Sequence, residues 1–190
     1  MDEEALRAVT VGELKRLDAQ IVLAEYDPDW PHQFARAAAR IRARLGDRVM
    51  LLEHVGSTSV PGLAAKPRID IVLAVADSAD EPAFVPPLEA AGYTLRIREP
   101  DWWQHRMLMG EDPTQNLHVF TIGCPEVERM LQFRNWLRSH DDDRQRYEDT
   151  KRSLAAQTWA YGQNYADAKS EVVEDILRRA GAPAKELVAQ

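Results

Sequence analysis

The chain has 190 residues, with 31 acidic and 24 basic side chains and a formal net charge of −7. This charge argues against broad binding to nucleic acid or to an anionic membrane, since like charges repel. No apolar run is long enough to cross a bilayer, and the start of the chain lacks the apolar core of a signal peptide. A single cysteine, Cys124, excludes a disulfide framework. We therefore expect one cytoplasmic domain over 1–190.

The first part of the chain contains three predicted elements. Leucines and a valine at helical spacing within 1–20 predict a peripheral amphipathic helix. The apolar run 21–26 predicts a strand. A helix is predicted to begin near Pro31, and Gly46 is expected to end it.

Two further apolar runs, 49–55 and 69–75, predict buried strands. The second carries Asp70, and a carboxylate seldom lies within an apolar strand unless it has a partner or a function. The remaining predicted strands cover 93–98, 105–109 and 116–122, with a helix over 82–91. The predicted fold class is α/β (α+β), with a mixed sheet flanked by helices in a core over 21–125.

A helical tail is predicted to pack on this core over 126–182. Its first helix begins near Glu126, its second covers 141–159, and Gly162 separates the second from a third over 165–180. The last residues, 184–190, are expected to fray.

The loop between the two central strands has the parts of a phosphate-binding site. Gly56 allows the backbone to approach an anion, and Ser57 and Thr58 add hydroxyl donors. Lys66 and Arg68 supply positive charge. The expected partner is a nucleotide or another phosphorylated small molecule. The alternative is that the glycines of this loop only turn the chain.

Asp70 has two interpretations. It is the candidate catalytic residue and metal ligand, because Mg²⁺ takes one or two protein carboxylates together with phosphate oxygens. Alternatively, its carboxylate accepts hydrogen bonds from loop N–H groups and is structural.

Residues 53–71, EHVGSTSVPGLAAKPRIDI, resemble the signature of the GrpB family. The resemblance extends to 26–31, 116–119 and 133–138, and to the pairs Tyr147–Lys151 and Tyr165–Lys169, so it covers nearly the whole chain. It implies a nucleotidyltransferase-like sheet. The family is largely uncharacterised, and a related domain is fused to dephospho-CoA kinases in some bacteria.

The sequence departs from the pattern of active nucleotidyltransferases, which usually carry a second carboxylate two residues after the first. That position is Val72 here, and the counterpart of a third carboxylate is His118. Glu53 is a candidate replacement carboxylate, and His118 a candidate general base or a core histidine. Two functions therefore remain open: Mg²⁺-dependent nucleotidyl transfer, and a degenerate module that binds the ligand without transferring it.

The other candidates depend on orientation. Glu53 and His54 are neighbours on a strand and should face opposite sides, so only one of them should lie in the site. Arg106 is a further candidate phosphate contact. Lys151 and Lys169 each follow a tyrosine by four residues on one helix face. Packing is the favoured interpretation of these pairs, with closure over an anion as the alternative.

Overall fold

The computed structural model describes residues 1–183, so the predicted frayed end at 184–190 lies outside the described residues. Its core is one five-stranded sheet with the strand order β1-β2-β5-β4-β3. β2 and β5 are parallel, and every other neighbouring pair is antiparallel. The strands are β1 (Leu51–Val55), β2 (Ile69–Val75), β3 (Tyr93–Glu99), β4 (His105–Glu111) and β5 (Thr114–Thr121). The predicted mixed sheet is confirmed.

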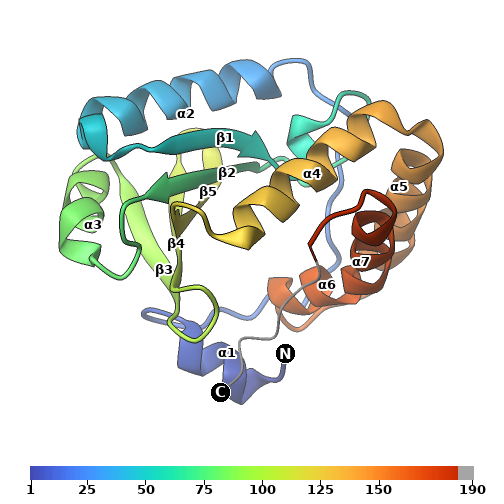
Figure 1. Cartoon of the computed structure of the whole chain (residues 1–190). Helices are drawn as coiled ribbons and strands as arrows, with labels where there is room; N and C mark the ends of the chain where they lie inside the picture. Colours follow the sequence, from blue (N-terminus) through green and yellow to red (C-terminus); the bar gives the residue numbers. More distant parts are fainter. Residues whose placement is uncertain (184–190) are drawn as a thin grey trace.

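Helices cover both faces of this sheet (Figure 1). α2 (Trp30–Leu45) and α3 (Glu81–Glu89) pack on one face, where Ile69, Ile71 and Leu73 of β2 join their core. α4 (Pro125–Ser139) packs on the other face, against Val72 and Phe120. Since β2 is buried on both faces, its sequence is a continuous apolar run interrupted only by Asp70.

The rest of the tail stands beside the sheet in Figure 1. It consists of α5 (Asp141–Ala155), α6 (Gly162–Ala168) and α7 (Ser170–Arg179). A separate core joins α5 and α7 to α4 and to the loop after β1, through Val60, Leu63, Tyr147 and Ile176. No helix in the described part of the chain is long and apolar enough to cross a membrane.

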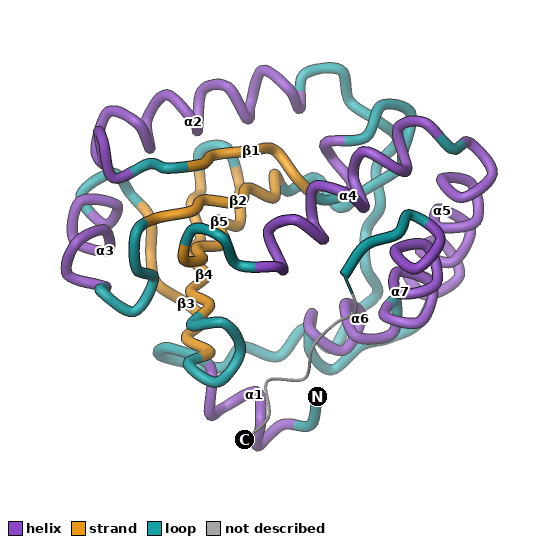
Figure 2. The backbone as a smooth tube through the Cα atoms, viewed as in Figure 1, coloured by secondary structure: helices purple, strands orange, loops and turns teal. Residues whose placement is uncertain are grey.

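Two predictions for the N-terminal part were wrong. The helix expected over 1–20 is only α1 (Glu3–Val9), because Thr10 pairs with Ile97 at the edge of β3. Residues 21–26 form no strand, and Figure 2 draws the whole connection from α1 to α2 as loop. This segment makes one bridge, Ala24 to Ala65, and Ile21 packs against α5 and α6. Its apolar residues therefore join the tail to the core.

The tail also differs from its predicted boundaries. The second helix ends at Ala155 rather than 159, and Gly162 begins α6 rather than lying in a break before the third helix. The predicted helix over 165–180 is divided at Lys169, which lies between α6 and α7. This division matters because Lys169 lies near Asp70 at the start of β2.

Candidate functional site

The candidate site lies on the α4 side of the sheet, where β2 and β5 run side by side. Their parallel register pairs Asp70 with Asn116 and Val72 with His118. Paired residues of neighbouring strands share a face, and side chains alternate along a strand. Asp70, Asn116 and His118 therefore project from one face. We call them, together with Gly56, Lys66, Arg68 and Lys169, the Asp70 site.

Hydrogen bonds orient the Asp70 carboxylate. Asn116 Nδ2 donates to Asp70 Oδ1 at 2.9 Å, and Arg68 Nη1 donates to Asn116 Oδ1 at 3.1 Å. His118 Nε2 lies 4.0 Å from the same Asp70 oxygen. Burial raises the pKa of Asp70, and the Asn116 hydrogen bond opposes this shift. Sequence reasoning assigned no role to Asn116, although it opens the strand segment that contains His118.

Gly56 brings the loop backbone against this carboxylate. Its φ is +68° and its ψ is −173°, a conformation essentially confined to glycine. A Cβ at this position would lie 2.5 Å from Asp70 Oδ2 and 2.9 Å from Asp70 Cβ. The glycine is thus required both by the backbone and by the approach to Asp70.

We expect Gly56→Ala to displace Asp70 and to destabilise the fold by more than Gly62→Ala does, since both changes strain the backbone by about 1–3 kcal/mol but only the Cβ at position 56 overlaps Asp70. Gly62→Ala is the matched control, because Gly62 also has a positive φ (+77°) but nothing within 4 Å of an added Cβ. Denaturant unfolding of the two variants measures the difference. Equal destabilisation would show that contact with Asp70 contributes nothing.

Three cations surround the single carboxylate. Lys66, Arg68 and Lys169 all favour the ionised form of Asp70 electrostatically. Lys66 and Lys169 are half-buried, and within residues 1–183 neither ammonium group donates a hydrogen bond or forms an ion pair. Lys169 Nζ lies 4.6 Å from the centre of the Tyr165 ring. Burial lowers the pKa of Lys66, and the charges of Arg68 and Lys169 add to this shift.

A fourth cation, Lys151 of α5, lies near Lys169 in the interior of the protein. Its side chain is 2% exposed, Nζ donates to the carbonyl oxygen of Ala64, and the Tyr147 ring lies 4.8 Å away. Burial, with Lys169 nearby, lowers the pKa of Lys151 to about 7. Lys151 therefore packs in the interior, whereas Lys169 contributes its charge to the Asp70 site.

Some predicted residues have other partners. Glu53 lies on the Asp70 side of the sheet, but its Oε2 accepts from Arg134 at 2.8 Å. His54 lies on the opposite face, stacked on Phe34, and its Nε2 is 3.0 Å from Thr58 Oγ1. Burial lowers the pKa of His54 to about 4. These contacts keep Glu53, His54 and the buried Thr58 hydroxyl out of the Asp70 site.

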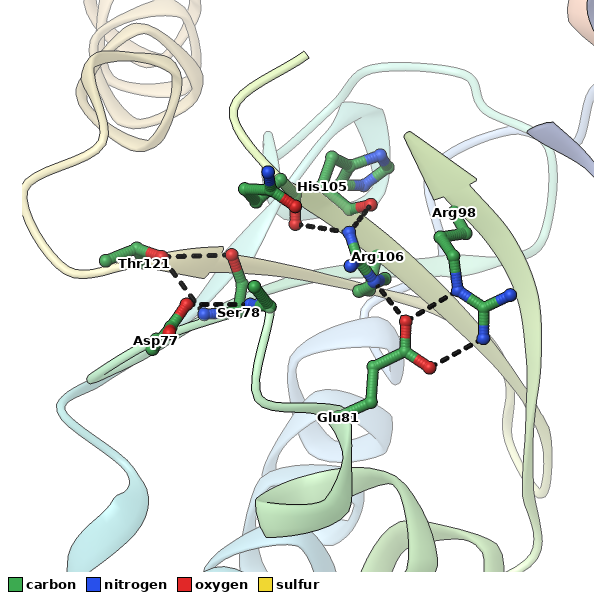
Figure 3. Close-up of polar contacts among 9 residues, drawn as sticks. Asp77, Ser78, Glu81, Arg98, His105, Arg106 and Thr121 are labelled. Atoms are coloured by element: carbon green, nitrogen blue, oxygen red, sulfur yellow. Dashed lines mark hydrogen bonds and ion pairs between the residues drawn. The ribbon is translucent and has the colours of Figure 1, made fainter. Parts of the chain in front are cut away.

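Arg106 also lies away from Asp70. It pairs with Val119 in the β4–β5 register, on the face covered by α2 and α3. Figure 3 shows the Glu81 carboxylate between Arg98 and Arg106, and Arg106 also donates to two main-chain oxygens. By contrast, the Ser57 side chain is half-buried, and no group in the described chain makes a hydrogen bond with its hydroxyl.

The residues present do not fit a two-metal centre. Among the described residues, no three histidine, cysteine or acidic side chains are placed to hold a metal ion. Asp70 is the single carboxylate of the Asp70 site, and Val72, at the position of the second, is fully buried. The positive charges around Asp70 favour an anion over a cation.

The fold and the site thus define an α/β protein in which three cations surround one carboxylate at the start of β2. Residues 20–179 match the family model described as GrpB protein. A UPF0157 protein of Halalkalibacterium halodurans is 58% identical over 180 residues, covering 95% of this chain and 92% of that protein. The chain belongs to the GrpB family, as the sequence resemblance predicted.

A solved structure and a longer relative also match most of this chain. The crystal structure of the conserved protein GrpB from Enterococcus faecalis matches with a TM-score of 0.68 and 28% identity, covering 84% of this chain and 96% of that one. A dephospho-CoA kinase of Mycolicibacterium paratuberculosis is 32% identical over 188 residues, covering 85% of this chain but 46% of that protein. The chain therefore spans about half the length of that relative.

Proposed function

We propose that this protein binds a phosphorylated small molecule, of which a nucleotide is the leading candidate, at the Asp70 site. The observation that carries the proposal is the pair of half-buried ammonium groups, Lys66 and Lys169, that have no acceptor in the described chain. Partly desolvated cations without partners are costly, and a phosphate group supplies negative charge and several acceptor oxygens.

The neighbouring groups suit the same ligand. Arg68 adds a third positive charge, and the half-buried Ser57 hydroxyl is available as a donor. Gly56, which has no Cβ, lets the backbone of this loop lie against the Asp70 carboxylate. These groups come from the loop between β1 and β2 and from the junction of α6 with α7, so a bound phosphate would join the sheet to the tail.

The residues of the Asp70 site support binding without transfer best, because Val72 stands where active nucleotidyltransferases carry the second carboxylate. Mg²⁺-dependent nucleotidyl transfer is the second candidate. It is favoured by one observation, the placement of His118 Nε2 4.0 Å from Asp70 Oδ1, where His118 could accept a proton from an acceptor hydroxyl.

Calorimetric titration tests the proposal. The panel contains inorganic phosphate, nucleoside mono-, di- and triphosphates, and dephospho-CoA, after which the related kinase is named. We expect binding without Mg²⁺, and about tenfold tighter binding of inorganic phosphate by Asp70→Asn, because this change removes a negative charge beside the phosphate. Absence of binding by both proteins would refute the proposal. Binding that requires Mg²⁺ and is lost in Asp70→Asn would favour transfer instead.

A further inference from the structure

A line of side chains crosses three strands and ends at Asp70. Glu99 Oε2 of β3 lies 2.6 Å from His105 Nδ1 of β4. His105 Nε2 lies 3.0 Å from His118 Nδ1 of β5, and His118 Nε2 faces Asp70 Oδ1 at 4.0 Å. The His105 side chain is 4% exposed, and its ring stacks on His118 and on Phe120. The line therefore runs from the β3 side of the sheet to the Asp70 site.

The donor and acceptor roles along this line follow from its first member. A carboxylate only accepts, so His105 Nδ1 carries a proton toward Glu99. In a neutral His105 ring, Nε2 then has a lone pair and accepts the Nδ1 proton of His118. His118 Nε2 is consequently left without a proton, and it is directed toward the site.

The distance between His118 and Asp70 also indicates that His118 Nε2 carries no proton. A protonated His118 Nε2 next to the Asp70 carboxylate would form a charge-assisted hydrogen bond of about 2.7–2.9 Å. The observed separation is 4.0 Å. Two acceptors that face each other across this distance leave a position for a proton donor of a ligand between them.

We propose that Glu99 and His105 are positioning residues, which hold His118 in the tautomer with an unprotonated Nε2. His118 and Asp70 then together accept a hydrogen bond from a hydroxyl group of the bound molecule. This inference rests on the proposed function and narrows it: the ligand class is a phosphorylated molecule that carries a hydroxyl group, as sugar phosphates and nucleotides do. The lysines bind its phosphate, and the His118–Asp70 pair selects its hydroxyl.

The tautomer can be read in the free protein by long-range ¹H–¹⁵N correlation NMR of ¹⁵N-histidine-labelled samples. At pH 7 we expect the proton of His118 on Nδ1 in the wild type. His105→Phe keeps a ring beside Phe120 but removes the acceptor, so Nε2 of His118 should become protonated. His32→Gln, at an exposed histidine, is the control and should change nothing. A wild-type His118 that carries its proton on Nε2 overturns the proposal, whether or not any variant folds.

A second measurement tests the ligand hydroxyl. The wild type should bind ribose 5-phosphate at least tenfold more tightly than inorganic phosphate, and His105→Phe should lose this preference while retaining its affinity for inorganic phosphate. Equal weakening of both ligands would overturn the selective role of His118. The tautomer is measured without ligand, so the two proposals can fail separately. If the protein does not bind phosphate, the proposed function fails but the NMR result is unchanged.

Discussion

Replacing Lys66 or Lys169 by glutamine should weaken binding of the phosphorylated ligand by about 10- to 100-fold. A hydrogen bond to a charged group contributes about 1.5–3 kcal/mol, and both lysines are half-buried beside Asp70. Neither ammonium group has an acceptor within residues 1–183. The same changes should therefore raise the stability of the free protein, because they remove a cation that lies close to other cations. Calorimetric titration and thermal unfolding measure the two effects.

Weaker ligand binding together with higher stability would identify the lysines as part of a binding site rather than a structural one. Lys15→Gln is the matched control, since Lys15 is exposed and has no partner in the described structure. It should alter neither affinity nor stability. A loss of stability in Lys66→Gln and Lys169→Gln, with phosphate affinity unchanged, would show that both lysines only support the fold.

Glu81→Gln should destabilise the fold by about 3 kcal/mol at neutral pH, the lower end of the range for breaking a buried ion pair. Glu81 bridges Arg98, which is partly exposed, and Arg106, whose side chain is 5% exposed (Figure 3). The variant removes the negative charge opposite the buried Arg106 guanidinium. Urea unfolding measures the loss, with Glu89→Gln as the control at an exposed position of the same helix.

The same ion pairs predict a pH dependence of the wild type. Hydrogen bonds from Arg98 and Arg106 lower the pKa of Glu81 from 4.5 to about 2. The folded state therefore holds this carboxylate ionised more strongly than the unfolded chain does. The stabilisation is present above pH 4.5 and is lost as the pH falls toward 2. In Glu81→Gln this part of the acid dependence should be absent. An unchanged acid profile would show that Glu81 contributes nothing to it.

The sheet could be predicted because its strands follow local rules. β2 is a nearly continuous apolar run, because it is buried on both faces. The segment 21–26 has the same composition but no neighbouring strand to extend the sheet, since β1 and β3 are the edges and this segment lies against α5 and the loop before β2. A short apolar run alone does not reveal which surface it covers.

The candidate site was predictable only in part. The resemblance to one family and the glycine, serine and aspartate spacing pointed to the loop and to Asp70. Alternation along β1 required Glu53 and His54 to face opposite sides, which the register confirms. The ion pair of Glu53 with Arg134 and the burial of Arg106 under α3 depend on which helix covers each face.

The order of amino acids alone thus decided the family, and it decided β1, β2 and the loop from Gly56 to Asp70 between them, because these two strands and their loop lie within one short stretch of the chain. Only the tertiary structure decided what surrounds the carboxylate. Lys169 comes from a helix junction 99 positions along the chain from Asp70, and the Glu99–His105–His118 line comes from three separate strands. Such contacts depend on strand order and helix packing, so no pattern of neighbouring residues predicts them.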